Sequence, residues 1–179
     1  MKYEQVLRFW FEEVEPAQVW MKDKAFDQLI TDKFSDVYQQ AIKCELFHWR
    51  VSPEGRLAEI ILLDQFSRNM FRDSGLAFKY DFLALSLSQQ ALLMGADKRI
   101  EKHKRGFMYL PYMHSESRII HSEALRIYQD FGNQSSLEFE IKHKNIIDEF
   151  GRYPHRNKAL GRVSTSEELV FLKGPNSGF

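Results

Sequence analysis

Cysteine is nearly absent from this 179-residue chain, and long apolar runs are missing from it. The one cysteine, Cys44, excludes an internal disulfide, and its place in an apolar helical pattern predicts a small core residue. No run approaches the roughly 18 apolar residues of a membrane-spanning helix, and Glu4, Glu12 and Glu13 exclude the apolar core of a secretion signal. We therefore expect a protein of the reducing cytoplasm with no membrane partner.

An excess of charge of either sign is also lacking. Lys and Arg together number 25, as do Asp and Glu, so no global field draws the chain toward nucleic acid or an anionic membrane. The most basic stretch, Lys98–Arg105, is diluted by Asp97 and Glu101 and has no interleaved aromatic residues on which bases could stack. We expect this stretch to be a solvated connection between helices, and we expect no nucleic-acid partner.

Apolar side chains are plentiful and recur at helical spacing. They make up 44% of the chain, with 15 Phe, 7 Tyr and 3 Trp, whereas the alternation typical of strands is hard to find. No linker or internal repeat is visible. We predict one all-α domain over residues 1–179, made of about seven helices. The expected helices are the segment before Pro16, residues 26–49, 53–72, 78–94, 107–131 and 137–150, and a short helix near 165–173.

Local signals mark several helix ends. Ser52 followed by Pro53 is typical of an N-cap and a first helical turn. Gly151 is typical of a helix C-terminus, and the spacing of Thr165 and Glu168 predicts a capping box. The run Ile60–Leu63 is apolar on every side, so we expect neighbours to surround that helix.

The first polar segment lies at the end of the expected helix 53–72. Asp64 and Arg68 stand four residues apart, and Gln65 and Asn69 form a row beside them. This stripe either faces solvent with an Asp64–Arg68 surface pair, or it faces an internal or cleft network in which the amides are hydrogen-bonded.

The second polar segment contains His114, Glu116, Arg118 and His121. Arg118 between the two histidines would repel a divalent cation, so we expect no metal there and favour a histidine that caps or bridges neighbouring helices.

The third polar segment runs from Phe150 to Asn157 and includes Arg152. If Pro154 begins a short helix, His155 and Arg156 put positive charge in its first turn, where the helix dipole favours anions. Their partner is either a carboxylate of this chain, Asp64 or Glu116 for instance, or a bound anionic ligand.

Motifs of nucleophilic or cofactor-dependent enzymes are absent. The chain has no Gly-x-Ser-x-Gly and no glycine-rich phosphate loop, so we expect no cofactor. Acid–base chemistry by His114, His155, Asp64 or Glu116 is the enzymatic alternative that remains.

Taken together, the segments Leu63–Asn69, Tyr109–Glu116 and Phe150–Asn157 resemble the bacterial domain-of-unknown-function family 924. The resemblance spans the chain from Val6 to the terminal Phe179, with Ser67 standing where the family often has proline. It implies helices packed as antiparallel pairs in a tetratricopeptide-like superhelical arrangement, and it carries no catalytic assignment.

Three hypotheses follow. The first is a binding domain in which the three segments converge to line a groove for a small anionic molecule or a peptide. The second is an enzyme that uses His114 or His155 as general acid or base on a carboxylate or phosphate substrate. The third is a buried polar network that fixes the fold. The sequence gives no oligomeric state. The candidate residues are Asp64, Gln65, Arg68, Asn69, His114, Glu116, Arg152, His155, Arg156 and Asn157.

Overall fold

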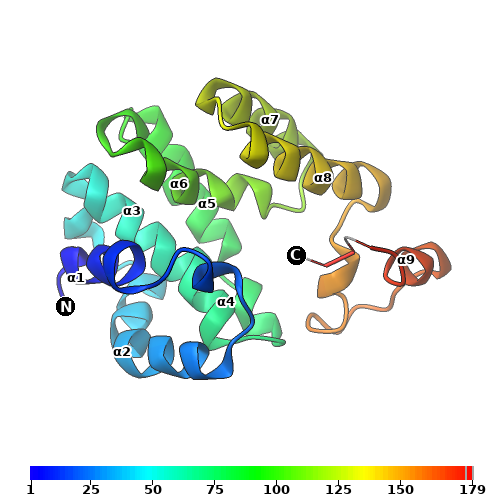
Figure 1. Cartoon of the computed structure of the whole chain (residues 1–179), viewed down its shortest axis with the longest axis horizontal. Helices are drawn as coiled ribbons and strands as arrows, with labels where there is room; N and C mark the ends of the chain where they lie inside the picture. Colours follow the sequence, from blue (N-terminus) through cyan, green and yellow to red (C-terminus); the bar gives the residue numbers. More distant parts are fainter. Residues whose placement is uncertain (176, 179) are drawn as a thin grey trace. The chain divides into compact units, whose positions relative to one another are not determined.

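The computed structural model describes residues 1–175 and 177–178, and in this part of the chain it contains helices and turns but no strands (Figure 1). The all-α prediction is confirmed. The α-helices are α1 (Tyr3–Arg8), α2 (Lys24–Ile42), α3 (Pro53–Ile61), α4 (Ser67–Met70), α5 (Asp81–Leu93), α6 (Lys102–Met113), α7 (Arg118–Phe131), α8 (Gln134–Phe150) and α9 (Ser166–Phe171). Short 3-10 or π-helical segments are η1 (Phe9–Glu13), η2 (Gln18–Trp20), η3 (Phe47–Val51), η4 (Leu62–Phe66), η5 (Gly75–Phe78), η6 (Asp97–Arg99) and η7 (Pro154–Arg156).

The chain divides into two compact units. The first comprises Met1–Arg72 and Leu76–Pro111, and the second comprises Asp73–Gly75 and Tyr112–Phe179. One domain over residues 1–179 and a tetratricopeptide-like arrangement of its helices both stay predictions. Among the described residues, no helix has the length and apolar character needed to cross a membrane.

The core of the first unit is built around α3 and η4. The run Ile60–Leu63 is fully buried, which confirms the prediction of a helix packed on every side. Three phenylalanine rings pack together in this core. The ring centre of Phe34 lies 4.9 Å from that of Phe9 and 4.8 Å from that of Phe66. Aromatic pairs at such distances stabilise a core beyond the area that they bury.

The N-terminus of α3 follows its sequence signal. The hydroxyl of Ser52 accepts a hydrogen bond from the backbone N–H of Gly55 at 3.0 Å, as expected for an N-cap. Gly55 is also required by packing, since a Cβ there would lie 2.1 Å from the carbonyl oxygen of Trp49. Only a glycine at position 55 therefore allows η3 and α3 to approach so closely.

The expected helix 26–49 is too long, and the prediction of a buried Cys44 is wrong. The structure ends α2 at Ile42 and places Cys44 in the left-handed region with φ 58°, exposed to solvent. Backbone N–H groups of Cys44 and Glu45 bond to the carbonyls of Ala41 and Gln40, the pattern of a Schellman motif. Cysteine rarely holds this conformation, so no local signal marked the end of the helix.

Two further boundaries differ from the expected ones. The helix predicted over 53–72 contains the π-helical turn η4 before it continues as α4. The helix predicted over 107–131 is broken after Met113, because Ser117 caps a new helix by accepting a hydrogen bond from Ile120 N–H at 3.5 Å. Both differences fall within predicted polar segments.

The second unit contains a helical hairpin. α7 and α8 lie side by side and are joined by Gly132, whose φ is 68°, and Asn133, which caps α8 (Figure 1). α8 ends at Gly151 with φ 70°, and Thr165 and Glu168 form a capping box for α9, so both predictions are confirmed. Beyond the hairpin, Tyr153 packs with Ile146 and Ile147 of α8 to form a small hydrophobic core.

Candidate functional site

The first polar segment is buried in the first unit. Asp64 is fully buried, and Gln65 and Asn69 are each 6% exposed, so this stripe does not face solvent. Gln65 donates to a carboxylate oxygen of Asp64 at 2.5 Å. The segment therefore forms the internal network that the sequence offered as an alternative.

Arg68 is held by two carboxylates of its own unit. Its Nη1 lies 3.2 Å from the Asp64 carboxylate, and its two Nη atoms donate to Asp81 at 3.1 and 2.9 Å. Asp27 organises the other side of the stripe, since it accepts from Asn69 at 2.9 Å and from Arg72 at 2.5 and 2.6 Å. Such two-pronged pairs between an arginine and a carboxylate are strong and directional.

Glu116 joins the second polar segment to the third within the second unit. Its carboxylate accepts from the backbone N–H of Tyr153 at 2.8 Å and from Arg162 at 2.6 and 2.9 Å. Burial would raise the pKa of Glu116, but the hydrogen bonds from Arg162 and Tyr153 outweigh burial and lower it. Glu116 is therefore ionised and links two segments of the chain.

Arg152 and Asn157 converge on Glu168. Arg152 donates to both carboxylate oxygens of Glu168, at 2.6 and 2.9 Å, and Asn157 donates to the same group at 3.1 Å. The hydrogen bonds from Arg152 dominate the surroundings of Glu168 and lower its pKa to about 2. The positive charge of Arg152 is thus matched by a carboxylate that is 2% exposed.

His121 and Glu140 make a buried connection between α7 and α8. Nδ1 of His121 lies 2.8 Å from Oε1 of Glu140, and Nε2 lies 2.8 Å from the carbonyl oxygen of Ser115. Because a carbonyl only accepts, Nε2 carries a hydrogen, and one proton is left between Nδ1 and Glu140. The prediction of a histidine that bridges neighbouring helices is confirmed, with His121 in that role.

The remaining candidates surround the buried ring of Tyr153. The guanidinium of Arg156 lies 4.5 Å from the ring centre, and the ring of His155 lies 5.4 Å from it. The Tyr153 hydroxyl donates to the carbonyl of Met113 at 2.6 Å, just before half-buried His114. Within the described residues, no group of three His, Cys, Asp or Glu side chains is placed to hold a metal ion.

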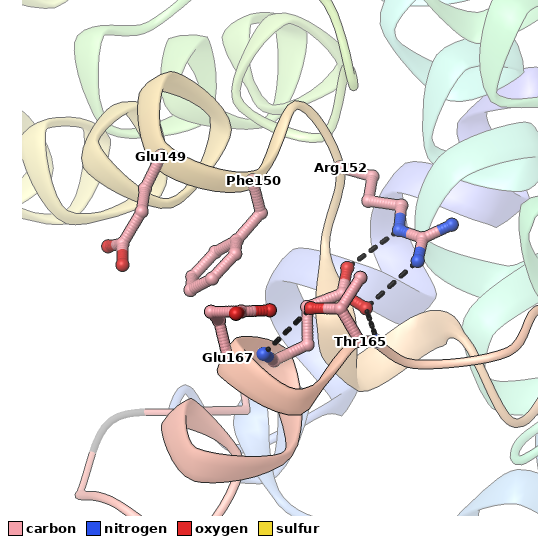
Figure 2. Close-up of a pocket in the computed structure, with 6 residues that line it drawn as sticks. Glu149, Phe150, Arg152, Thr165 and Glu167 are labelled. Carbon is pink, nitrogen blue, oxygen red and sulfur yellow. Dashed lines mark hydrogen bonds and ion pairs between the residues drawn. The ribbon is translucent and has the colours of Figure 1, made fainter.

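The second unit also contains an open pocket of about 490 Å³. Figure 2 shows the ring of Phe150 reaching from the end of α8 toward Glu167 of α9, with Arg152 on the other side of the pocket. Glu149 and Glu167 are exposed, so the pocket has carboxylates at its edge and an aromatic ring in its wall. Its lining residues are Glu149, Phe150, Arg152, Thr165, Glu167 and Glu168.

The sequence-predicted residues thus fall into two groups. Asp64, Gln65, Arg68 and Asn69 are networked in the first unit, and the other six candidates belong to the second. That all three segments converge in one site stays a prediction. Several partners were missed, because they lie 13 to 46 positions from the charged residues that they pair with, and no local spacing could have indicated these pairs. The pairs are to Arg68, Arg72, Glu116, His121 and Arg152. The missed partners are Asp27, Asp81, Glu140, Arg162 and Glu168.

Two comparisons with known proteins agree with each other. The model of the family described as bacterial protein of unknown function (DUF924) matches residues 6–176. A solved structure, that of the protein of unknown function ATU0120 from Agrobacterium tumefaciens, is similar with a TM-score of 0.91 and 34% sequence identity. The match covers 96% of this chain and 97% of that one. A comparison with curated proteins found no match.

Proposed function

The chain belongs to the DUF924 family of bacterial proteins of unknown function, and we propose that it is a cytoplasmic binding domain whose ligand occupies the pocket beside Arg152. The open pocket of about 490 Å³ is the observation that carries this proposal. Its size suits a small molecule or one side chain of a peptide.

We assign a supporting role to the first two polar segments and to the Arg152–Glu168 pair of the third. Arg68 is paired with Asp64 and Asp81, and Arg152 is paired with Glu168. An anionic ligand at either arginine would have to displace a carboxylate of the chain itself. The contacts therefore favour segments that fix the fold over segments that line a groove for an anion.

The charge of the pocket favours a cationic group on the ligand. Glu167 stays ionised, because its own backbone N–H and the Thr165 hydroxyl hold its pKa below the ordinary value. Glu149 adds a second exposed carboxylate, and the face of Phe150 can cover an apolar stem or a cation. A lysine or arginine side chain of a peptide has this combination of stem and charge.

Calorimetric titration with N-acetyl-arginine amide tests the proposal, with N-acetyl-citrulline amide as the neutral probe of the same length and shape. We expect binding of the arginine probe alone, weakened about two- to fivefold by Glu167→Gln. Glu138→Gln, which removes an exposed carboxylate elsewhere on α8, is the matched control and leaves the affinity unchanged. Equal binding of both probes would refute the charge preference, and binding of neither would refute the pocket as a ligand site.

A further inference from the structure

A partly exposed aromatic cluster lies beside the basic segment Lys98–Arg105 of the first unit. Phe11 and Trp20, which are far from this segment in sequence, both pack on Phe107 of α6. The ring centres of Trp20 and Phe107 are 5.8 Å apart at an interplanar angle of 11°, a stacked geometry. The fold thus supplies the aromatic residues that the basic segment lacks among its sequence neighbours.

Trp20 is arranged as a stacking platform. Of the three tryptophans in the chain, Trp10 and Trp49 are buried, whereas Trp20 is 64% exposed. One face of its indole ring lies on Phe107, so a flat ligand ring could stack on the other face. A large aromatic side chain that stays exposed although it is already ordered by stacking is a common feature of binding surfaces.

Positive charge approaches this platform from two segments. Lys98–Arg105 contains five Lys or Arg residues and one Glu, and Lys22 and Lys24 follow Trp20 as exposed residues. Lys104 lies 5.6 Å from the centre of the Phe11 ring, and His103 packs against the same ring at 6.1 Å. The acidic residue of the segment, Glu101, is engaged by Lys104 at 2.7 Å.

The opposite charges nearby are partly compensated. The Asp97 carboxylate is 8% exposed and accepts a hydrogen bond from the Tyr109 hydroxyl at 2.9 Å. Glu13 is paired with Arg8 at 3.0 Å and with Lys33 at 3.2 Å. Glu12 and Glu15 are exposed in the N-terminal segment between Phe11 and Trp20, so we place the anionic part of a ligand on the lysines of α6 and not on that segment.

We propose that Trp20, Phe107 and the neighbouring lysines form a binding surface for single-stranded nucleic acid. A base would stack on Trp20, and phosphates would pair with Lys102 and with Lys104, displacing the exposed Glu101 from its surface pair. A stacking platform beside a cationic track is the combination by which proteins hold unpaired strands without reading their sequence. This surface uses residues other than those of the pocket beside Arg152, and it stands or falls independently of the function proposed there.

Tryptophan fluorescence of the full chain tests the inference, because the exposed indole of Trp20 reports directly on stacking. Oligothymidylate of about 12 nucleotides should quench the fluorescence saturably, and its affinity should fall as salt rises from about 50 to 200 mM. Trp20→Ala should remove the quenching. It should also weaken binding about tenfold, as measured by the fluorescence anisotropy of a labelled strand. Trp20→Phe should restore most of the affinity without the quenching.

Matched controls separate stacking from general charge and hydrophobicity. Phe82→Ala removes another exposed aromatic side chain, 70% exposed on α5, and should leave binding unchanged. Lys102→Ala with Lys104→Ala should weaken binding and reduce its salt dependence, whereas Lys142→Ala on α8 should not.

Several outcomes would overturn the inference. These are the absence of oligothymidylate binding at low salt, unchanged affinity in Trp20→Ala, and equal affinity for duplex DNA. Equal affinity for thymidine monophosphate would mean that the surface takes a single nucleotide and not a strand. Tighter binding to vesicles of anionic phospholipid than to the oligonucleotide would identify a membrane surface instead.

Discussion

The carboxylate of Glu140 lies 2.8 Å from Nδ1 of His121, and both side chains are fully buried. This pair links the two helices of the α7–α8 hairpin through a proton that neither partner can exchange freely with solvent. Burial raises the pKa of Glu140, although the hydrogen bond from His121 acts in the opposite direction. The hairpin therefore depends on a polar contact in its interior.

Removing one partner of this pair should destabilise the protein strongly. Glu140→Ala leaves His121 without its acceptor, and we expect a loss of about 3 kcal/mol in the free energy of unfolding. Glu140→Gln keeps the shape and can donate to Nδ1 of neutral His121, so its loss should be smaller by about half. Urea unfolding followed by circular dichroism measures both values. Equal losses in the two variants would contradict the hydrogen-bonded arrangement.

Acid should weaken the contact between Arg152 and Glu168. The pKa of Glu168 is about 2 in the folded protein against an ordinary value of 4.5. A lowered pKa means that the folded state binds the proton less tightly, so this stabilisation is present above pH 4.5 and is lost as the pH falls toward 2. Glu168→Gln should flatten this part of the profile of stability against pH, whereas Glu138→Gln should not. A profile that is unchanged in Glu168→Gln would show that another group causes the acid sensitivity.

A substitution at Gly55 tests the packing at the start of α3, because the backbone of η3 approaches closely there. Gly55→Ala would push a methyl group into the carbonyl of Trp49, and we expect a loss of about 3 kcal/mol or more. Gly106→Ala in α6 is the matched control, because no atom lies within 4 Å of a Cβ there. That change should be neutral or stabilise by about 0.5 to 1 kcal/mol. Similar melting temperatures for the two variants would argue against the described contact.

Asp27 should contribute more to the stability of the fold than an exposed carboxylate of the same helix does. It accepts hydrogen bonds from Asn69 and Arg72, so Asp27→Ala leaves a buried amide and a guanidinium without their acceptor. We expect a loss of about 2 kcal/mol in the free energy of unfolding. Asp32→Ala, five positions further along α2, removes an exposed carboxylate and should cost less than about 0.5 kcal/mol. A loss in Asp27→Ala as small as that in the control would refute the supporting role of the first polar segment.

The sequence predicts those features of the fold that depend on neighbouring residues. Ser52, Gly151 and Thr165 act at helix ends through contacts three or four residues away, and each was predicted correctly. Cys44 was missed because a left-handed cysteine follows no local preference.

The candidate site was predicted only in part, for a related reason. Residue chemistry identified Arg68, Glu116 and Arg152 as polar groups that need partners. Their partners Asp81, Arg162 and Glu168 come from other elements, and packing alone selects them. The stacking of Trp20 on Phe107 was invisible for the same reason, since the two residues meet only after the first unit folds.

The pocket beside Arg152 is the proposed ligand site, and the polar network around Asp64 and Arg68 is proposed to stabilise the fold. Two-dimensional NMR spectra of ¹⁵N-labelled protein, recorded during addition of N-acetyl-arginine amide, distinguish these two roles. We expect saturable chemical-shift changes at the backbone amides of Phe150, Thr165 and Glu167, and no change at the amides around Asp64. Shifts centred on Asp64 and Arg68, with those of the pocket unchanged, would contradict this expectation.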